Sequence, residues 1–374
     1  MEKIVSGASP LKMAIPIIKI VGNFCNLRCG YCFYHTEDQD ARHVMSEGLL
    51  EKFLSEYMKL FSGHLIFIWH GGEPLFAGLP FFKKIIDFQK RNIKPEQTIQ
   101  NNIQTNATLI NDEWAEFFKE NCFRVGVSLD GDQKSHNLFR KDRDGDGSFN
   151  RVMRGVEILR RHGIKPGFIQ TITHENVSRA KKDFIFFTDV LKAKGWGVNA
   201  YLDIDQANSV MAEQEITNED FIKFLITYIN FWLAKDDQHL RIREIDNFIS
   251  GIIGRRARNC AFNGSCADFF CLEYNGKIYP CDRSSNHPEL LLGDLSQQLL
   301  SEILNSSTRL NYTKKINSPH SDCIVCEWQS ACHNGCAMQR INGIDGKHYY
   351  CETRKTIFEY LKEKVIKLKK IERR

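Results

Sequence analysis

The chain has 374 residues, 42% apolar and 26% charged, a composition typical of a folded protein with one large or two smaller domains. Its net charge of +5, from 51 basic and 46 acidic residues, is too small to indicate a nucleic-acid or membrane partner. Residues 1–11 lack the apolar core of a signal peptide, and no apolar run approaches the roughly 18 residues of a membrane helix, so we expect a cytoplasmic protein. In that reducing compartment the 13 cysteines are expected to be metal ligands or redox groups rather than disulfides.

The first 205 residues are predicted to alternate between strands and helices. Apolar runs predict strands at residues 14–22, 64–70, 100–105, 123–129, 167–173 and 198–204. Helical spacing of apolar residues, as in Leu50, Phe53 and Tyr57, predicts helices at 46–60, 81–91, 112–121, 148–162 and 179–194. The alternation is typical of βα units around a parallel sheet, in a partial barrel or a doubly wound sheet.

The pattern changes after residue 205. Thr217 and Asp220 are spaced as in a capping box, which predicts a helix to about Ala234. Nine cysteines follow Arg255, among few regular elements except a hairpin predicted at the Asn275-Gly276 turn. We expect a barrel domain over 1–234, a connector over 235–254, a cysteine-rich domain over 255–353 that needs its metals to fold, and a closing helix over 354–374.

Three cysteines, Cys25, Cys29 and Cys32, are spaced C-x3-C-x2-C directly after the first predicted strand. They supply one thiolate fewer than a closed four-ligand site requires. A cubane cluster on such a loop keeps one iron open, and an open metal position is where chemistry takes place. The alternatives are three buried cysteines without a metal, or a zinc site completed by a distant His.

Polar residues and glycines follow the next three predicted strands. Gly72 and Glu73 stand after the second strand, Gln104 and Asn106 at the end of the third, and Ser128 and Asp130 at the end of the fourth. Ligands of parallel βα folds bind at the carboxyl ends of the strands. These side chains therefore lie where a ribose and an amino acid could be held, and Glu73 could accept a hydrogen bond from an ammonium group.

The segments CNLRCGYC, WHGGEPL, QTNATLI, VSLDG and HNLFRKD, in this order, resemble the radical S-adenosylmethionine (SAM) domain of anaerobic sulfatase-maturating enzymes. The resemblance covers residues 14–205 and implies a partial (β/α)6 barrel of the α/β class that binds SAM and a [4Fe–4S] cluster. It implies that Glu73 holds the SAM amino group, Ser128 and Asp130 contact the ribose or methionine part, Arg140 contacts the SAM carboxylate and Tyr31 packs near the adenine. It further implies that Tyr34 and His70 face the substrate.

The later cysteines match the seven-cysteine pattern of SPASM domains, and Cys260 makes an eighth. By this resemblance two auxiliary [4Fe–4S] clusters are expected, one on Cys260, Cys266, Cys281 and Cys336 and the other on Cys323, Cys326, Cys332 and Cys351. A zinc ribbon at Cys323 and Cys326 is the alternative. Two cysteines are left over: Cys122 is expected to be a buried small residue, and Cys271 is not needed by the pattern.

Asp282 follows Cys281 directly, which fixes a carboxylate beside a cluster ligand. From the residues alone, Asp282 could equally accept hydrogen bonds from backbone N–H groups or from Arg283. By resemblance it is the general base of a maturase that oxidises Cβ of a Cys or Ser in a sulfatase to formylglycine through a 5′-deoxyadenosyl radical. The expected partners are a substrate with a Cys/Ser-x-Pro-x-Arg motif and an electron donor of the flavodoxin or ferredoxin type.

Two other functions fit part of the pattern. A peptide maturase that forms thioether or carbon–carbon crosslinks would share the fold and the cluster cysteines, but often carries an N-terminal leader-binding domain. Only about 13 residues precede the first predicted strand, which favours the sulfatase-type function. A non-catalytic iron–sulfur electron carrier would leave the GGEP and SLDG segments unexplained.

Overall fold

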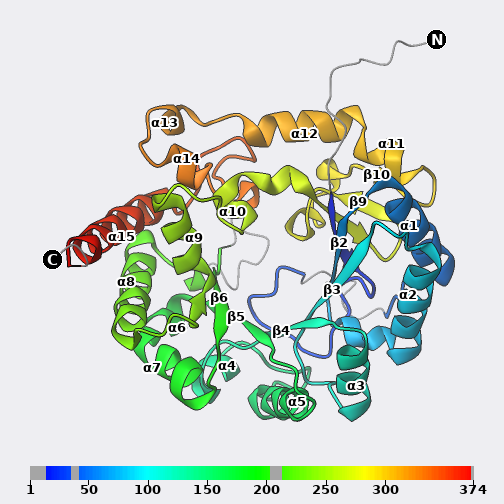
Figure 1. Ribbon diagram of the computed structural model, residues 1–374, viewed down its shortest axis with the longest axis horizontal. Helices are drawn as coiled ribbons and strands as arrows, with labels where there is room; N and C mark the ends of the chain where they lie inside the picture. Colours follow the sequence, from blue (N-terminus) through cyan, green and yellow to red (C-terminus); the bar gives the residue numbers. More distant parts are fainter. Residues whose placement is uncertain (1–13, 35–41, 203–212, 372–374) are drawn as a thin grey trace.

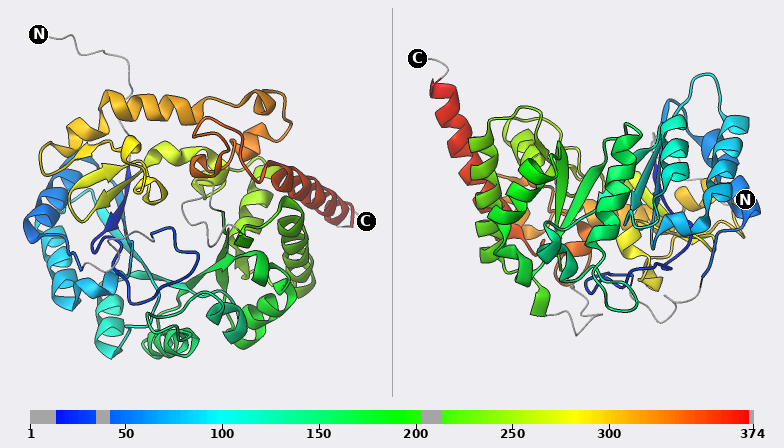
Figure 2. Two further views of the ribbon diagram at one scale, coloured as in Figure 1. Left: turned by 180° about the vertical axis from the view of Figure 1, so that it is seen from behind. Right: turned by 90° about the horizontal axis from the view of Figure 1, so that it is seen from below.

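The computed structural model describes residues 14–34, 42–202 and 213–371. Its centre is a curved sheet of ten strands, surrounded on the outside by helices (Figures 1 and 2). The strand order is β10-β9-β8-β1-β2-β3-β4-β5-β6-β7, and all neighbours from β8 to β7 are parallel. The fold is therefore an α/β partial barrel in which strands from the C-terminal half extend both edges.

All six predicted strands are present as neighbours in chain order. They are β1 (Ile15–Lys19), β2 (His64–His70), β3 (Thr98–Thr105), β4 (Arg124–Ser128), β5 (Gly167–Ile172) and β6 (Gly195–Ala200). In β2, Leu65, Phe67 and Trp69 are fully buried, whereas the alternate residues are not. This alternation is expected where one face of a strand packs on helices and the other lines a barrel interior.

The predicted helices of the barrel form with side-chain caps at several N-termini. The longer ones are α1 (Glu47–Leu60), α2 (Leu79–Asn92), α3 (Asp112–Glu120), α5 (Phe149–Arg161) and α8 (Asn218–Lys235). Ser46 accepts a hydrogen bond from the Leu49 N–H at 3.2 Å, and Thr217 accepts one from the Asp220 N–H at 3.1 Å, which confirms the predicted start of α8. Within the described ranges, no helix is long and apolar enough to cross a membrane.

Shorter elements complete the described chain. They are η2 (Pro74–Ala77), α4 (Gln133–Asn137), α6 (His174–Val177), β7 (Arg241–Ile242), α9 (Arg243–Ile252), α10 (Cys260–Asn263), η5 (Ser265–Asp268), η6 (Asp282–Ser284), η7 (Pro288–Leu290), α11 (Leu300–Leu304), α12 (Ser307–Asn317), α13 (Ser321–Ile324), α14 (Gln329–Cys332), η8 (Ala337–Gln339) and α15 (Cys351–Ile371).

The prediction of one helix over 179–194 followed by a strand at 198–204 was wrong in its boundaries. The helical segment is α7 (Ala180–Ile185) continued by a π-helical turn (Phe186–Val190), and β6 begins at Gly195. Glycines have low strand propensity, so the pattern missed the start of β6. Gly197 is nevertheless required there, because an added Cβ would lie 2.7 Å from Cζ of Arg243. Residues 203 and 204 lie outside the described residues.

Cys122 is exposed, and the expectation that it is buried was wrong. It has a φ of +53° at the end of α3, where its N–H bonds to Lys119 and the Phe123 N–H bonds to Phe118. These two bonds form the left-handed turn that commonly ends a helix. The turn directs the thiol to solvent, and the apolar Phe123 after it is the residue that enters the core.

The predicted hairpin at Asn275-Gly276 is confirmed as β8 (Phe269–Glu273) and β9 (Lys277–Tyr279), with β10 (Gly293–Asp294) paired to β9. Its placement is unexpected, because β8 pairs in parallel with β1. Phe270, Leu272 and Ile278 are fully buried in the barrel core. The expectation that this region has little core other than its metals was therefore wrong for the hairpin.

A buried ion pair joins the hairpin to the first barrel strand. Lys19 ends β1 with 1% exposure, and its Nζ lies 2.7 Å from Oε1 of Glu273 at the end of β8. The same ammonium donates to Asn23 at 2.9 Å and to Ser285 at 3.1 Å. A buried charge is tolerated when it is paired and fully hydrogen-bonded, so these partners together hold Lys19 in place.

We expect Lys19→Met to lower the free energy of unfolding by about 3–5 kcal/mol, because it leaves the Glu273 carboxylate buried without a cation. Glu273→Gln should also destabilise, and the double variant should lose much less than the sum of the two single variants. The measurement is anaerobic denaturant unfolding of the cluster-reconstituted protein. Additive losses would show that the two side chains do not stabilise each other.

Candidate active site

The three cysteines of the C-x3-C-x2-C segment lie on the loop after β1, at the carboxyl ends of the parallel strands, and line a cavity of about 360 Å³. Burial raises the pKa of Cys25, Cys29 and Cys32, to about 12 for Cys29. Such thiols stay protonated at neutral pH unless a metal replaces the proton. In the part of the chain that the structure describes, no three side chains are grouped around a single metal ion. A cubane cluster has a different requirement, since each thiolate binds its own iron, and the three-thiol loop fits such a group.

Gly72 determines how closely the cysteine loop packs against the turn after β2. Its φ is +49°, and an added Cβ would lie 2.2 Å from the carbonyl oxygen of Phe24, the residue before Cys25. The N–H of Glu73 donates to the same carbonyl at 2.9 Å. A side chain at position 72 would displace the loop, so this glycine fixes the position of the cysteines.

The Glu73 carboxylate is fully buried and is not part of the cavity wall. It accepts hydrogen bonds from the N–H of Asn106 at 2.7 Å, the hydroxyl of Thr105 at 2.8 Å and the N–H of Leu75 at 3.1 Å. These bonds tie the turn after β2 to the end of β3. Its contact with a SAM amino group stays a prediction, whereas Gly72 of the same turn does line the cavity.

Three of the predicted cofactor residues, Gln104, Asn106 and Ser128, line the cavity from the ends of β3 and β4. Gln104 donates to the Ser128 hydroxyl at 3.0 Å. The Asn106 amide donates to the side chain of Asn26 in the cysteine loop at 2.9 Å. The polar strand ends are thus oriented by one another and by the loop, on the side of the cavity facing the cysteines.

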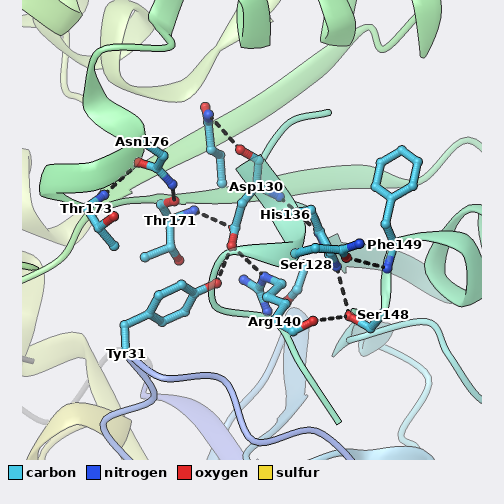
Figure 3. Close-up of polar contacts among 12 residues, drawn as sticks. Tyr31, Ser128, Asp130, His136, Arg140, Ser148, Phe149, Thr171, Thr173 and Asn176 are labelled. Carbon is cyan, nitrogen blue, oxygen red and sulfur yellow. Dashed lines mark hydrogen bonds and ion pairs between the residues drawn. The ribbon is translucent and has the colours of Figure 1, made fainter. Parts of the chain in front are cut away.

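Asp130 lies at the centre of a buried polar network that includes Tyr31 and Arg140 (Figure 3). One carboxylate oxygen accepts from the Tyr31 hydroxyl and from Nε of Arg140 at 2.9 Å, and the other accepts from the Thr171 N–H at 2.9 Å. The guanidinium also lies 5.4 Å from the centre of the Tyr31 ring. Tyr31 and Arg140 line the cavity but Asp130 does not, so Asp130 acts on the cavity by orienting them.

A buried histidine behind this network was not predicted. Nδ1 of His136 faces the Asp130 N–H at 3.4 Å, and Nε2 lies 2.9 Å from the Ser148 hydroxyl, which in turn donates to the Arg140 carbonyl at 2.7 Å (Figure 3). Burial holds the pKa of His136 well below its usual value, so the ring is neutral. The available signal was its place in the HNLFRKD segment, which also contains Arg140.

Tyr34, His70 and Asp282 meet at one side of the cavity. The Tyr34 hydroxyl lies 3.3 Å from Nδ1 of His70 and 3.4 Å from Oδ2 of Asp282. Burial raises the pKa of Tyr34 and lowers that of His70, so both side chains are neutral near pH 7. The Lys19 ammonium lies 4.1 Å from the centre of the Tyr34 ring. The structure thus brings together the three predicted catalytic residues, from segments far apart in the sequence.

The eight later cysteines gather in the two predicted groups. A hydrogen bond with Cys266 and burial raise the pKa of Cys260, and the nearby thiols of Cys336 and Cys281 add to the shift. Burial raises the pKa of Cys323, with contributions from Cys332 and Cys326, and Cys332 also acts on Cys351. Each group supplies four thiols, enough to close one cluster. Cys271 is buried in β8 and belongs to neither predicted set.

Arg283 is a cavity residue to which no role was assigned from the sequence. It lines the cavity beside Tyr34 and His70, with its guanidinium 6.0 Å from the Phe33 ring. The charges of Cys336, Asp282 and Cys281 act on it. Arg283 therefore lies between the cavity and the first auxiliary group of cysteines.

Burial raises the pKa of Glu73 to about 7, against the opposing effect of its three hydrogen-bond donors. An unfolded Glu titrates near 4.5, so unfolding releases a proton between about pH 4.5 and 7 and stability falls as pH rises through this window. We expect the SAM-free protein to lose roughly 3 kcal/mol more than Glu73→Gln over the window. Denaturant unfolding at several pH values measures the difference, and parallel pH profiles would contradict the assignment.

Asp130→Asn should weaken SAM binding by roughly 10- to 100-fold, because it removes the charge that orients Arg140 and Tyr31. Asp132→Asn is the matched control, since Asp132 pairs with Arg179 and does not line the cavity. Equilibrium binding of SAM to the reconstituted proteins measures both. Equal losses in the two variants would mean that the turn alone is responsible.

Comparison with known proteins places this site in a family. The model of the radical SAM superfamily matches residues 19–187, and that of the SPASM iron–sulfur cluster-binding domain matches residues 262–327. The serine-type anaerobic sulfatase-maturating enzyme of Bacteroides thetaiotaomicron is 31% identical over 92% of this chain and 88% of its own length. The cysteine-type enzyme of Clostridium perfringens is also 31% identical, over 92% and 95%.

Solved structures give the same result. The structure of anSMEcpe with bound AdoMet matches with a TM-score of 0.86 at 29% identity, covering 95% of this chain and 98% of that one. The complex of anSMEcpe with AdoMet and the Cp18Cys peptide matches with a TM-score of 0.85 at 28% identity, covering 95% and 99%. SuiB of Streptococcus suis, 14% identical with a TM-score of 0.66, covers 91% of this chain and 76% of that one and shares the fold. The chain therefore belongs to the anaerobic sulfatase-maturating enzyme family, and it is a radical SAM enzyme with a SPASM domain.

Proposed function

We propose that this enzyme oxidises Cβ of a Cys or Ser side chain in a sulfatase to formylglycine. The observation that carries the proposal is the meeting of Tyr34, His70 and Asp282 at the cavity that the three-cysteine loop also lines. When bound there, SAM and its cluster supply a 5′-deoxyadenosyl radical that takes a hydrogen atom from the substrate carbon. The chain's own residues must then hold the substrate and accept its proton.

Asp282 is the proposed general base for the substrate thiol or hydroxyl. It is a carboxylate beside a dry cavity, held 3.4 Å from the Tyr34 hydroxyl and within hydrogen-bond reach of a group placed next to that tyrosine. His70 and Tyr34 are neutral, so they can orient the substrate by hydrogen bonds without competing for its proton. Loss of the proton and of two electrons gives an aldehyde from Ser, or a thioaldehyde from Cys that water hydrolyses to formylglycine.

The cofactor contacts are proposed on the same basis. Gln104, Asn106, Ser128, Tyr31 and Arg140 line the cavity and would hold SAM, with the Arg140 guanidinium suited to its carboxylate. Glu73 and Asp130, which lie behind the wall, would act by fixing the backbone and side chains in front of them.

The finer description of partners is also a proposal. The substrate would carry the Cys/Ser-x-Pro-x-Arg motif, and a flavodoxin- or ferredoxin-type protein would supply the electron. A reducing, cytoplasmic setting is supported by the thirteen cysteines, all of which are free thiols.

Asp282→Asn should lower formylglycine formation by at least about 100-fold, because the amide cannot accept the substrate proton. Cleavage of SAM should persist, since Asp282 is not part of the cavity wall at the cysteine loop. The assay is anaerobic incubation with SAM and a Cys-x-Pro-x-Arg peptide, followed by mass spectrometry of peptide and nucleoside. Asp268→Asn is the control, a carboxylate two residues from Cys266 that pairs with Arg256 at 3.6 Å.

Three other outcomes of this assay would contradict the proposal. Wild-type activity in Asp282→Asn would remove the base assignment. A crosslinked peptide in place of the aldehyde would identify a peptide maturase. Absence of SAM binding to the reconstituted protein would leave an electron carrier.

A further inference from the structure

A second and larger cavity, of about 1080 Å³, opens at the amino ends of β4, β5 and β6. Its wall consists of the starts of these strands, the loops that lead into β5 and β6, and the segment 241–258 that contains α9, which lies beside β6 (Figure 1). Gln104, Ile169 and Arg243 line both this cavity and the one at the cysteine loop. The two cavities therefore meet inside the barrel and form one passage, which we name the barrel passage.

The outer part of the barrel passage is strongly basic. Nine of its lining residues are Lys or Arg, and one, Asp246, is acidic. Four of the nine pair with a carboxylate, namely Lys194, Arg241, Arg243 and Arg256. The other five, Arg160, Lys165, Lys192, Arg255 and Arg258, make no ion pair with any described residue. An excess of one sign in a concave site focuses its field and favours an anionic occupant.

Arg243 stands where the two cavities meet. Its Nη2 donates to the Val198 carbonyl at 2.9 Å and to the Asn199 side chain at 2.7 Å, and Nε donates to Glu244 at 2.6 Å. The absence of a side chain at Gly197 makes room for the guanidinium. Arg243 is thus fixed in the wall rather than free to fill the passage, and its charge faces both ends.

The volume and position of this opening indicate a chain segment rather than a small ion. Pockets of about 300–1,000 Å³ hold a drug-sized ligand. A polypeptide in the passage would bring one of its residues to Tyr34 and Asp282 while its flank stays among the basic side chains. We infer that the protein substrate enters through the barrel passage and that the segment flanking its target Cys or Ser is acidic. This inference rests on the proposed function and adds the charge of the substrate to it.

The test compares two peptides with the same Cys-x-Pro-x-Arg core, one with Asp/Glu-rich flanks and one with Ser/Gly flanks. Their affinities for the reconstituted, SAM-bound enzyme are measured by fluorescence anisotropy at low and high salt. The rim variant carries Lys165→Glu, Lys192→Glu and Arg255→Glu, three exposed residues in loops at the outer end. The control variant carries Lys59→Glu, Lys83→Glu and Lys90→Glu, the same charge change on the exposed faces of α1 and α2.

We expect the wild type to bind the acidic-flank peptide roughly tenfold more tightly at low salt, with a smaller preference at high salt. The rim variant should lose this preference, and the control variant should keep it. Equal affinities in the wild type, or a preference that survives in the rim variant, would overturn the inference. Iron content and circular dichroism identify any variant that fails to fold, and Lys165→Gln with Lys192→Gln then replaces it.

Activity of the same peptides separates this inference from the proposed function. If the acidic-flank peptide binds preferentially but no formylglycine forms, the proposed function fails and the passage stands. If both peptides are oxidised with equal kcat/KM, the proposed function stands and the charge of the passage has no role in substrate choice.

Discussion

The site depends on one buried cation, the ammonium of Lys19. Its 1% exposure means that water satisfies little of its charge, so the protein must do so. The partners come from three parts of the chain: Glu273 from β8, Asn23 from the cysteine loop and Ser285 from the turn after Asp282. Because these partners must converge for Lys19 to be buried, the cation fixes the cysteine-rich half of the chain against the first barrel strand. The Tyr34 ring above the ammonium is held by the same arrangement.

A second constraint acts on the thiols. Burial raises the pKa of Cys29 and Cys281 so far that neither is a thiolate at neutral pH without a metal. The energy of cluster binding must therefore include the cost of releasing these protons. The barrel itself does not depend on that energy, since its strands and helices share a large apolar core that also takes in β8 and β9. Metal dependence is accordingly concentrated in the loops that carry the cysteines.

Much of this arrangement could be predicted from the sequence, because it follows from local patterns. The alternation in HLIFIWH gives β2 to the residue, and polar residues just after β3 and β4 lead to Gln104, Asn106 and Ser128 in the cavity wall. Contacts between distant segments could not be predicted in this way. Nothing in the residues around Phe270 specifies that β8 pairs with β1, and nothing in IIKIVG shows that Lys19 is buried. The inward orientation of Glu73 and Asp130 was hidden for the same reason: spacing gives the strand end on which a carboxylate lies, but the donors of neighbouring strands determine where it points.

The turn after β9 shows how the fold couples separate tasks over a few residues. The Ser284 hydroxyl accepts from the Cys281 N–H at 3.0 Å and donates to the Cys281 carbonyl at 2.7 Å, which closes the turn on itself. Within this rigid turn Cys281 faces the thiols of the first auxiliary group, Asp282 faces Tyr34 and Arg283 faces the cavity. Successive residues of a tight turn point in different directions, so a shift of one side chain moves the others. A proton acceptor, a cation at the cavity wall and a cluster ligand are thereby held in a fixed relation, which flexible segments could not maintain.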